Sequence, residues 1–177
     1  MICYRNIALL LSFFFLEALN AQSLDSERFD TTISIFWNKD IKVRLKIFNP
    51  GEEDISRKNA VLIVFNSHFG AQRVQYVDSL FAYTIVFRMI DTDGNGIKDL
   101  LIYNANNGQE NKSYHLYLVD QLSEKLKPVK GFKKLYDPYY DQNECLIVGF
   151  ESYDKRLMLG HYQIDKNGNL SMTTWRH

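Results

Sequence analysis

The chain of 177 residues contains two cysteines and three prolines, and it has no excess of charge of either sign. Lysine plus arginine and aspartate plus glutamate number 21 each, so the formal net charge is zero. A protein that binds nucleic acid through its phosphates needs a basic surface, and this composition provides none. We therefore expect no nucleic-acid partner, and the length is that of one ordinary domain.

Long apolar runs are scarce, and the most prominent one lies at the N-terminus. Ile7–Leu16 follows the positive charge of Arg5 and precedes a stretch that ends in a small residue, Ala21. This order is typical of a secretory signal peptide, and the run is shorter than the roughly 20 apolar residues of a membrane-spanning helix. We predict a signal peptide at residues 1–21, a mature domain at 22–177 in the periplasm or secreted, and no membrane span after cleavage.

Cysteine is also scarce in the predicted mature chain. Removal of residues 1–21 takes Cys3 away, so Cys145 remains as the single thiol and no internal disulfide is expected. Because Cys145 lies in the apolar run 144–150, we expect a buried, inert thiol in a strand.

A sustained apolar period of 3.6 residues is absent from the mature chain. Short runs rich in β-branched and aromatic residues recur instead, separated by turn signals such as Asn49-Pro50-Gly51. This pattern predicts an all-β fold of antiparallel hairpins that form a sandwich or a small propeller-like array. The stretch 122–134 could carry a short helix or a loop. The predicted strands are 31–37, 41–48, 60–65, 73–77, 82–90, 99–103, 113–119, 144–150, 157–164 and 170–175.

One acidic loop carries a recognisable chemistry. Residues 91–99 read DTDGNGIKD, which places oxygen-bearing side chains at positions 1, 3, 5 and 9 of an EF-hand-like loop. Glycine stands at position 6, where such a loop bends, and position 7 can offer its backbone carbonyl. Calcium takes about six to eight oxygen ligands, so we predict a calcium site. The predicted ligands are Asp91, Asp93, Asn95, Ile97 (through its carbonyl) and Asp99.

The loop departs from an EF-hand in its last ligand and in its flanks. Position 12, which carries a bidentate glutamate in an EF-hand, is Ile102, and the flanking segments resemble strands. We therefore expect an EF-hand-like loop between two strands, with weaker affinity than in cytosolic calcium buffers. The alternative is an ordinary acidic hairpin turn without an ion.

From the acidic loop to the end, the chain resembles a group of exported bacterial proteins. The stretches DTDGNGIKDLLIYNANNG, NKSYHLYLVD and KKLYDPYYDQNECLIVGFESYD occur here in the order found in calcium-loop periplasmic proteins similar to invertebrate-type lysozyme inhibitors. That group includes immunity proteins against peptidoglycan-hydrolase toxins, and the resemblance covers about half of the chain. It implies inhibition by occlusion, in which a rigid loop enters the cleft of a lysozyme-like hydrolase.

The same resemblance implies which residues touch the partner. The inserted loop would correspond to the turn at Ser152, Tyr153, Lys155 and Arg156, with Tyr162 further along the chain. Tyrosine supplies rigid contact area, and a basic side chain can pair with a catalytic carboxylate. The alternative for this turn is a solvated hairpin tip.

The expected function is therefore binding without catalysis. The four histidines lack the spacing of a metalloprotease, and no Gly-x-Ser-x-Gly elbow is present. We predict a calcium-dependent inhibitor or immunity protein for a lysozyme-like peptidoglycan hydrolase. The alternative is a calcium-stabilised secreted module for adhesion or glycan binding.

Overall fold

The computed structural model describes residues 29–68, 71–106, 110–154, 156–165 and 167–175. The predicted signal peptide and Lys155 lie outside the described residues, so both stay predictions. Within the described ranges, no helix is long and apolar enough to cross a membrane.

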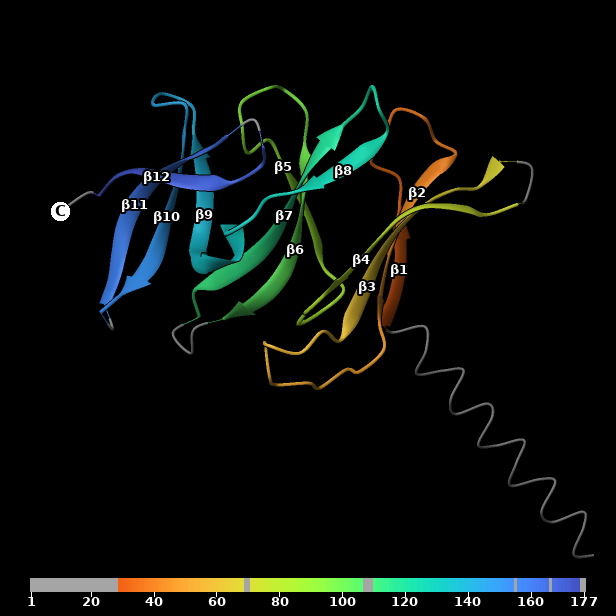
Figure 1. Ribbon diagram of the computed structural model, residues 1–177, viewed down its shortest axis with the longest axis horizontal. Coiled ribbons are helices and arrows are strands. Elements are labelled where there is room, and N and C mark those ends of the chain that lie inside the picture. Colours follow the sequence, from red (N-terminus) through yellow and green to blue (C-terminus); the bar gives the residue numbers. More distant parts are fainter. Residues whose placement is uncertain (1–28, 69–70, 107–109, 155, 166, 176–177) are drawn as a thin grey trace, which may run out of the picture.

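The twelve strands of the described residues fall in chain order into three antiparallel meanders of four strands each (Figure 1). The first meander comprises β1 (Asp30–Ile33), β2 (Ile41–Ile47), β3 (Ala60–Asn66) and β4 (Arg73–Leu80). The middle meander comprises β5 (Phe87–Ile90), β6 (Asp99–Asn106), β7 (Lys112–Asp120) and β8 (Lys125–Pro128). The last meander comprises β9 (Leu135–Asp141), β10 (Leu146–Tyr153), β11 (Arg156–Ile164) and β12 (Leu170–Trp175), preceded by the short 3-10 helix η3 (Phe132–Lys134).

The first meander is a separate four-stranded sheet, and the other two share an eight-stranded sheet. They are joined where Ser113 of β7 pairs with Tyr136 of β9. The prediction of an all-β antiparallel fold is confirmed, and the arrangement is sandwich-like rather than a closed barrel.

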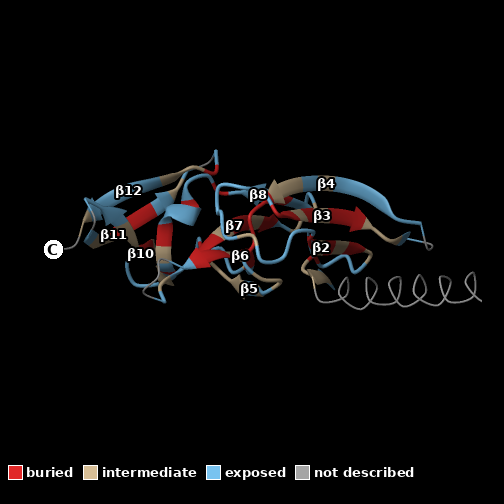
Figure 2. Ribbon diagram, turned by 90° about the horizontal axis from the view of Figure 1, so that it is seen from below, coloured by how far each residue is buried: buried red, intermediate tan, exposed pale blue. Residues whose placement is uncertain are grey.

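The middle meander is buried on both faces. On β6, Leu100 and Ile102 belong to a core shared with the first meander, whereas Leu101 belongs to a core shared with the last. On β7, Tyr117 faces the first core and Leu116 the second. Successive strand residues point to opposite faces, so one strand serves two cores, and the buried segments therefore run through the centre of the molecule (Figure 2).

The strand pattern in the first meander follows the sequence closely. In β2, Ile41, Val43 and Leu45 are fully buried while the lysines and arginine between them face outward. Strand β3 lies between β2 and β4, and its sequence from Ala60 to Phe65 is entirely apolar. Alternation predicts burial well here because only one face of this sheet meets a core.

The predicted strand 31–37 is wrong in its second half. Strand β1 ends at Ile33, and Phe36 is fully buried while Trp37 is 68% exposed. The backbone amide of Trp37 donates to Oε1 of Gln121 (2.8 Å), and Nε2 of Gln121 donates to the carbonyl of Ile35 (2.9 Å). The side chain of Gln121 thus bonds the backbone here in place of a neighbouring strand.

Two further expectations are corrected near the last meander. Residues 135–141, which the predicted strands leave out, form β9, and Asp137 adopts φ 46° beside an irregularity in the β9–β10 register. Cys145, expected in a strand interior, is exposed in the turn before β10 with φ 53°. It precedes the first paired residue of the strand, so the apolar run that follows it does not bury it.

Candidate metal centre

The acidic loop connects β5 to β6, and the pairing of Ile90 with Asp99 closes it. Gly94 and Gly96 adopt φ of 75° and 82°, a region that residues with a Cβ rarely enter. The two glycines therefore let the chain bend back sharply enough to bring its first and last residues together.

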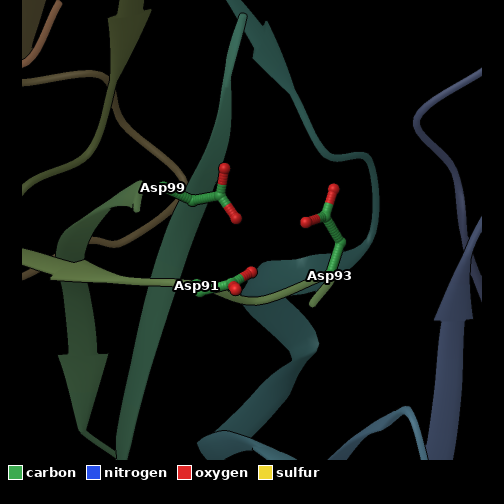
Figure 3. Close-up of side chains that lie close together, drawn as sticks. All are labelled: Asp91, Asp93 and Asp99. Carbon is green, nitrogen blue, oxygen red and sulfur yellow. The ribbon is translucent and has the colours of Figure 1, made fainter. Parts of the chain in front are cut away.

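Three carboxylates of this loop point into one common space (Figure 3). One oxygen from each of Asp91, Asp93 and Asp99 lies within 4.8 Å of the others. Asp91 is half-buried, Asp93 is exposed and Asp99 is buried, so the group extends from the surface into the protein. Such an arrangement can hold a metal ion. The distances also confirm the prediction that the spacing of these three residues brings them together.

Asp99 is the fixed end of the group. Its side chain is fully buried, and Oδ2 accepts hydrogen bonds from the backbone amide (3.1 Å) and hydroxyl (2.5 Å) of Thr92. Oδ1 accepts from the backbone amide of Val119 on β7 (3.1 Å). Burial raises the pKa of Asp99, while these three donors act in the opposite direction. The carboxylate of Asp99 is thus held between Thr92 of the acidic loop and Val119 of β7.

The other side chains of the loop are organised by the loop backbone. Asp91 accepts from the amides of Gly94 (2.8 Å) and Gly96 (2.9 Å). Asp93 accepts from both nitrogens of Asn95 (backbone 3.2 Å, side chain 3.0 Å). The Asp93 side chain is exposed, but the surrounding loop removes part of its solvent and so raises the pKa of its carboxyl, and the Asp91 carboxylate also acts to raise it.

Asn95 and Ile97 take part in the same network. The Oδ1 atom of Asn95 accepts from the backbone amide of Ile97 at 2.7 Å. A carbonyl or carboxylate oxygen has more than one acceptor site, so these bonds leave lone pairs available to a cation. The side chain of Ile97 packs against the first core, which anchors the end of the loop.

The donor set decides which metals fit. All predicted ligands offer oxygen, which suits hard cations such as calcium and does not suit zinc or copper. Three carboxylates this close repel one another unless a cation lies between them. A cation bound by Asp91, Asp93 and Asp99 would supply that positive charge.

Two residues outside the predicted set complete the surroundings. Thr92 is buried and holds Asp99 through two donors, and Tyr140 of β9 packs against Gly94. Tyr140 also lines a cavity of 220 Å³ together with Asp93 and Cys145. The sequence pattern did not identify either residue. Thr92 stands at position 2 of the loop, where no ligand is expected, and Tyr140 is more than forty residues away from the loop in the sequence.

The predicted partner-binding residues separate into two places. Ser152, Tyr153 and Arg156 lie exposed at the tip of the β10–β11 hairpin, where Tyr153 pairs with Arg156. Tyr153 is 65% exposed, and its ring centroid lies 6.3 Å from that of Trp175. Tyr162 is 2% exposed in the second core and donates from its hydroxyl to Glu151 (3.1 Å). Its ring therefore does not belong to the exposed surface of the tip.

The hairpin tip and the acidic loop lie at opposite ends of β10. The loop adjoins Cys145, just before β10 begins, whereas Tyr153 is the last residue of that strand. Eight residues of extended chain span roughly 20–25 Å. An ion in the loop would therefore act on the tip only through the rigidity of the sheet.

Comparison of the chain with family models, with curated proteins and with solved structures gave no match, so the interpretation of this site rests on its own geometry.

Proposed function

We propose that the protein is an exported, non-catalytic binding protein that inhibits a lysozyme-like peptidoglycan hydrolase, with a calcium ion in the loop 91–99. The convergence of Asp91, Asp93 and Asp99 within 4.8 Å is the observation that carries the calcium part. The exposed pair Tyr153 and Arg156 at the hairpin tip supports a protein-binding role. Periplasmic or secreted localisation follows from the sequence of residues 1–21 and belongs to the same proposal.

Calcium would stabilise the junction between the middle and last meanders. Asp99 is tied to β7 through Val119, and Gly94 lies under Tyr140 of β9. An ion that binds the three carboxylates would hold both ends of the loop against these strands. Because an ion that binds only the folded state raises stability by mass action, calcium should raise the melting temperature.

Substitution of Asp93 tests the calcium site. Asp93→Asn removes one charge without changing size, and it should weaken or abolish the rise in melting temperature that calcium causes. Asp93 is a better target than Asp99, because Asp93 is exposed and can reorient its side chain. An amide at the buried residue 99 would set its NH2 group against the amide of either Thr92 or Val119. A titration of the wild type by calorimetry should give one calcium per chain.

Asp165 provides a matched control for that substitution. It lies in the β11–β12 turn and accepts from the backbone amides of Asn167 and Asn169 (2.8 Å each), as an acidic turn residue does. Within the described residues, only the loop 91–99 groups three carboxylates. Asp165→Asn should leave the calcium effect unchanged, and an equal loss in both variants would contradict the proposed site.

A panel of lysozymes tests the inhibitory role. The purified protein should lower peptidoglycan hydrolysis by at least one member, and Tyr153→Ala or Arg156→Ala should relieve that inhibition. Leu122→Ala is the control, because Leu122 is 89% exposed and lies outside the tip. Binding to a polysaccharide with no effect on any hydrolase would instead favour the adhesion or glycan-binding alternative.

A further inference from the structure

A groove of 560 Å³ lies between the first and middle meanders, directly beside the acidic loop. Its size falls within the range of about 300–1,000 Å³ that is usual for ligand-binding sites. Three segments supply its apolar lining: β1 with the residues that follow it, β5, and the end of the acidic loop. These apolar residues are Ile33, Ile35, Trp37, Phe87, Met89 and Ile97.

Trp37 is the most exposed apolar side chain of this groove, at 68%. Its backbone is fixed by Gln121, so the ring stands on an ordered segment rather than on a free loop. Tryptophan is strongly enriched among the residues that contribute most to protein interfaces. A large exposed ring beside an apolar hollow is therefore a candidate anchor for a partner.

The two neutral polar side chains that line the groove, Gln121 and Ser34, are hydrogen-bonded within the chain. Gln121 uses Oε1 for the amide of Trp37 and Nε2 for the carbonyl of Ile35. The hydroxyl of Ser34 accepts from Nζ of Lys42 at 2.8 Å. A sugar ring needs side chains that are free to bond its hydroxyls, so this lining favours an apolar protein segment over a glycan.

The strand edges and the charge of the groove define that segment further. Among the described strands, β1 pairs only with β2 and β5 only with β6, so each presents an edge of its sheet. An extended chain can add to such an edge through main-chain hydrogen bonds. Lys98 is the one charged residue among those that line the groove, and it forms no ion pair within the part of the chain that the structure describes.

We propose that this surface, the Trp37 groove, binds an extended segment of a partner protein that carries an acidic residue next to apolar ones. The segment lies along the edge of β1 or β5, its apolar side chain packs against Trp37, and its carboxylate pairs with Lys98. The inference rests on the proposed binding role and deepens it, since it names a contact surface separate from the β10–β11 tip.

The acidic loop connects this groove to calcium. One wall of the groove is formed by the end of the acidic loop, at Gly96, Ile97 and Lys98. An ion that orders the loop therefore fixes that wall directly, whereas the hairpin tip is a strand length away. Partner binding in the Trp37 groove should thus weaken in chelator, at temperatures where the protein remains folded.

A displayed random peptide library tests the proposal without knowledge of the partner. The library is selected on the immobilised full-length protein in calcium and counter-selected on the Trp37→Ala variant. Enriched peptides should combine apolar residues with an aspartate or glutamate. A synthetic peptide of the enriched sequence should bind about tenfold more weakly to Trp37→Ala and to Lys98→Glu, and equally well to Leu122→Ala.

Each outcome decides the proposal. No enrichment over the Trp37→Ala variant, equal binding to Lys98→Glu, or enrichment of apolar peptides without an acidic residue would overturn it. The variants are checked by circular dichroism, and Trp37→Phe, which keeps an aromatic ring, should retain most of the binding. Peptide binding without inhibition of any hydrolase would support the Trp37 groove as a binding surface and reject a lysozyme-like hydrolase as the partner. Failure of the groove proposal can therefore be told apart from failure of the proposed function.

Discussion

The hydroxyl of Tyr140 occupies the space in which a Cβ at residue 94 would have to lie, and the Cζ of the same ring is 2.7 Å from that position. Residue 94 must therefore be glycine for two independent reasons, its φ of 75° and the tyrosine above it. Gly96 has a similar φ of 82°, but no other side chain or backbone atom lies within 4 Å of the place that a Cβ would take there.

This difference predicts unequal costs for alanine at the two glycines. Gly96→Ala should lower the free energy of unfolding by about 1 kcal/mol, from backbone strain. Gly94→Ala should cost about 2 kcal/mol more, because of the clash with Tyr140. Denaturant unfolding in calcium measures both. In a Tyr140→Phe background the excess cost at Gly94 should shrink, and an unchanged excess would contradict the contact.

His115 should make stability depend on pH. Its Nε2 donates to the carbonyl of Phe81 (2.9 Å), and burial lowers its pKa to about 4. In the unfolded state His115 has the ordinary pKa of 6.5. The contribution of His115 to the free energy of unfolding is therefore complete above pH 6.5. It falls by up to about 3 kcal/mol as the pH drops towards 4. Unfolding at about pH 7 and about pH 5 measures this fall. His115→Gln should reduce it, whereas an equal fall in the variant would place its origin elsewhere.

Asn59 should be essential to the junction between the first and middle meanders. It is 3% exposed; its Nδ2 donates to the carbonyls of Ala82 (3.2 Å) and Asn49 (3.3 Å), and its Oδ1 accepts from the amide of Ala82 (2.9 Å). Asn59→Ala leaves buried backbone groups unpaired and should cost about 3 kcal/mol by thermal unfolding. The exposed Asn38, which bonds Glu124, is the control: Asn38→Ala should cost about 0.5 kcal/mol or less.

Cys145 should react in the native state. Its side chain is exposed and lines the cavity that also contains Asp93. A water-soluble thiol reagent should modify one thiol per mature chain without denaturant, as measured by mass spectrometry. Calcium, which fixes the neighbouring loop, should change the rate. Protection until the protein unfolds would contradict the exposed position.

The residues that the sequence predicted well are those whose surroundings are local. The alternation of Ile41, Val43 and Leu45 follows from the two-residue period of a strand, and the spacing of the loop 91–99 follows from the geometry of one tight turn. In both cases the partners lie within a few residues of one another, so no long-range contact is needed to place them.

The remaining features depended on contacts between segments far apart in the chain. Phe36 is buried and Trp37 is exposed because Gln121, more than eighty residues away, bonds the backbone on either side of Phe36. Tyr140 reaches the loop because the last meander packs on the middle one. The sequence by itself thus determined the all-β class and the ligand spacing. The tertiary structure decided which meanders meet and which side chains stay exposed, since burial depends on distant partners that periodicity does not encode.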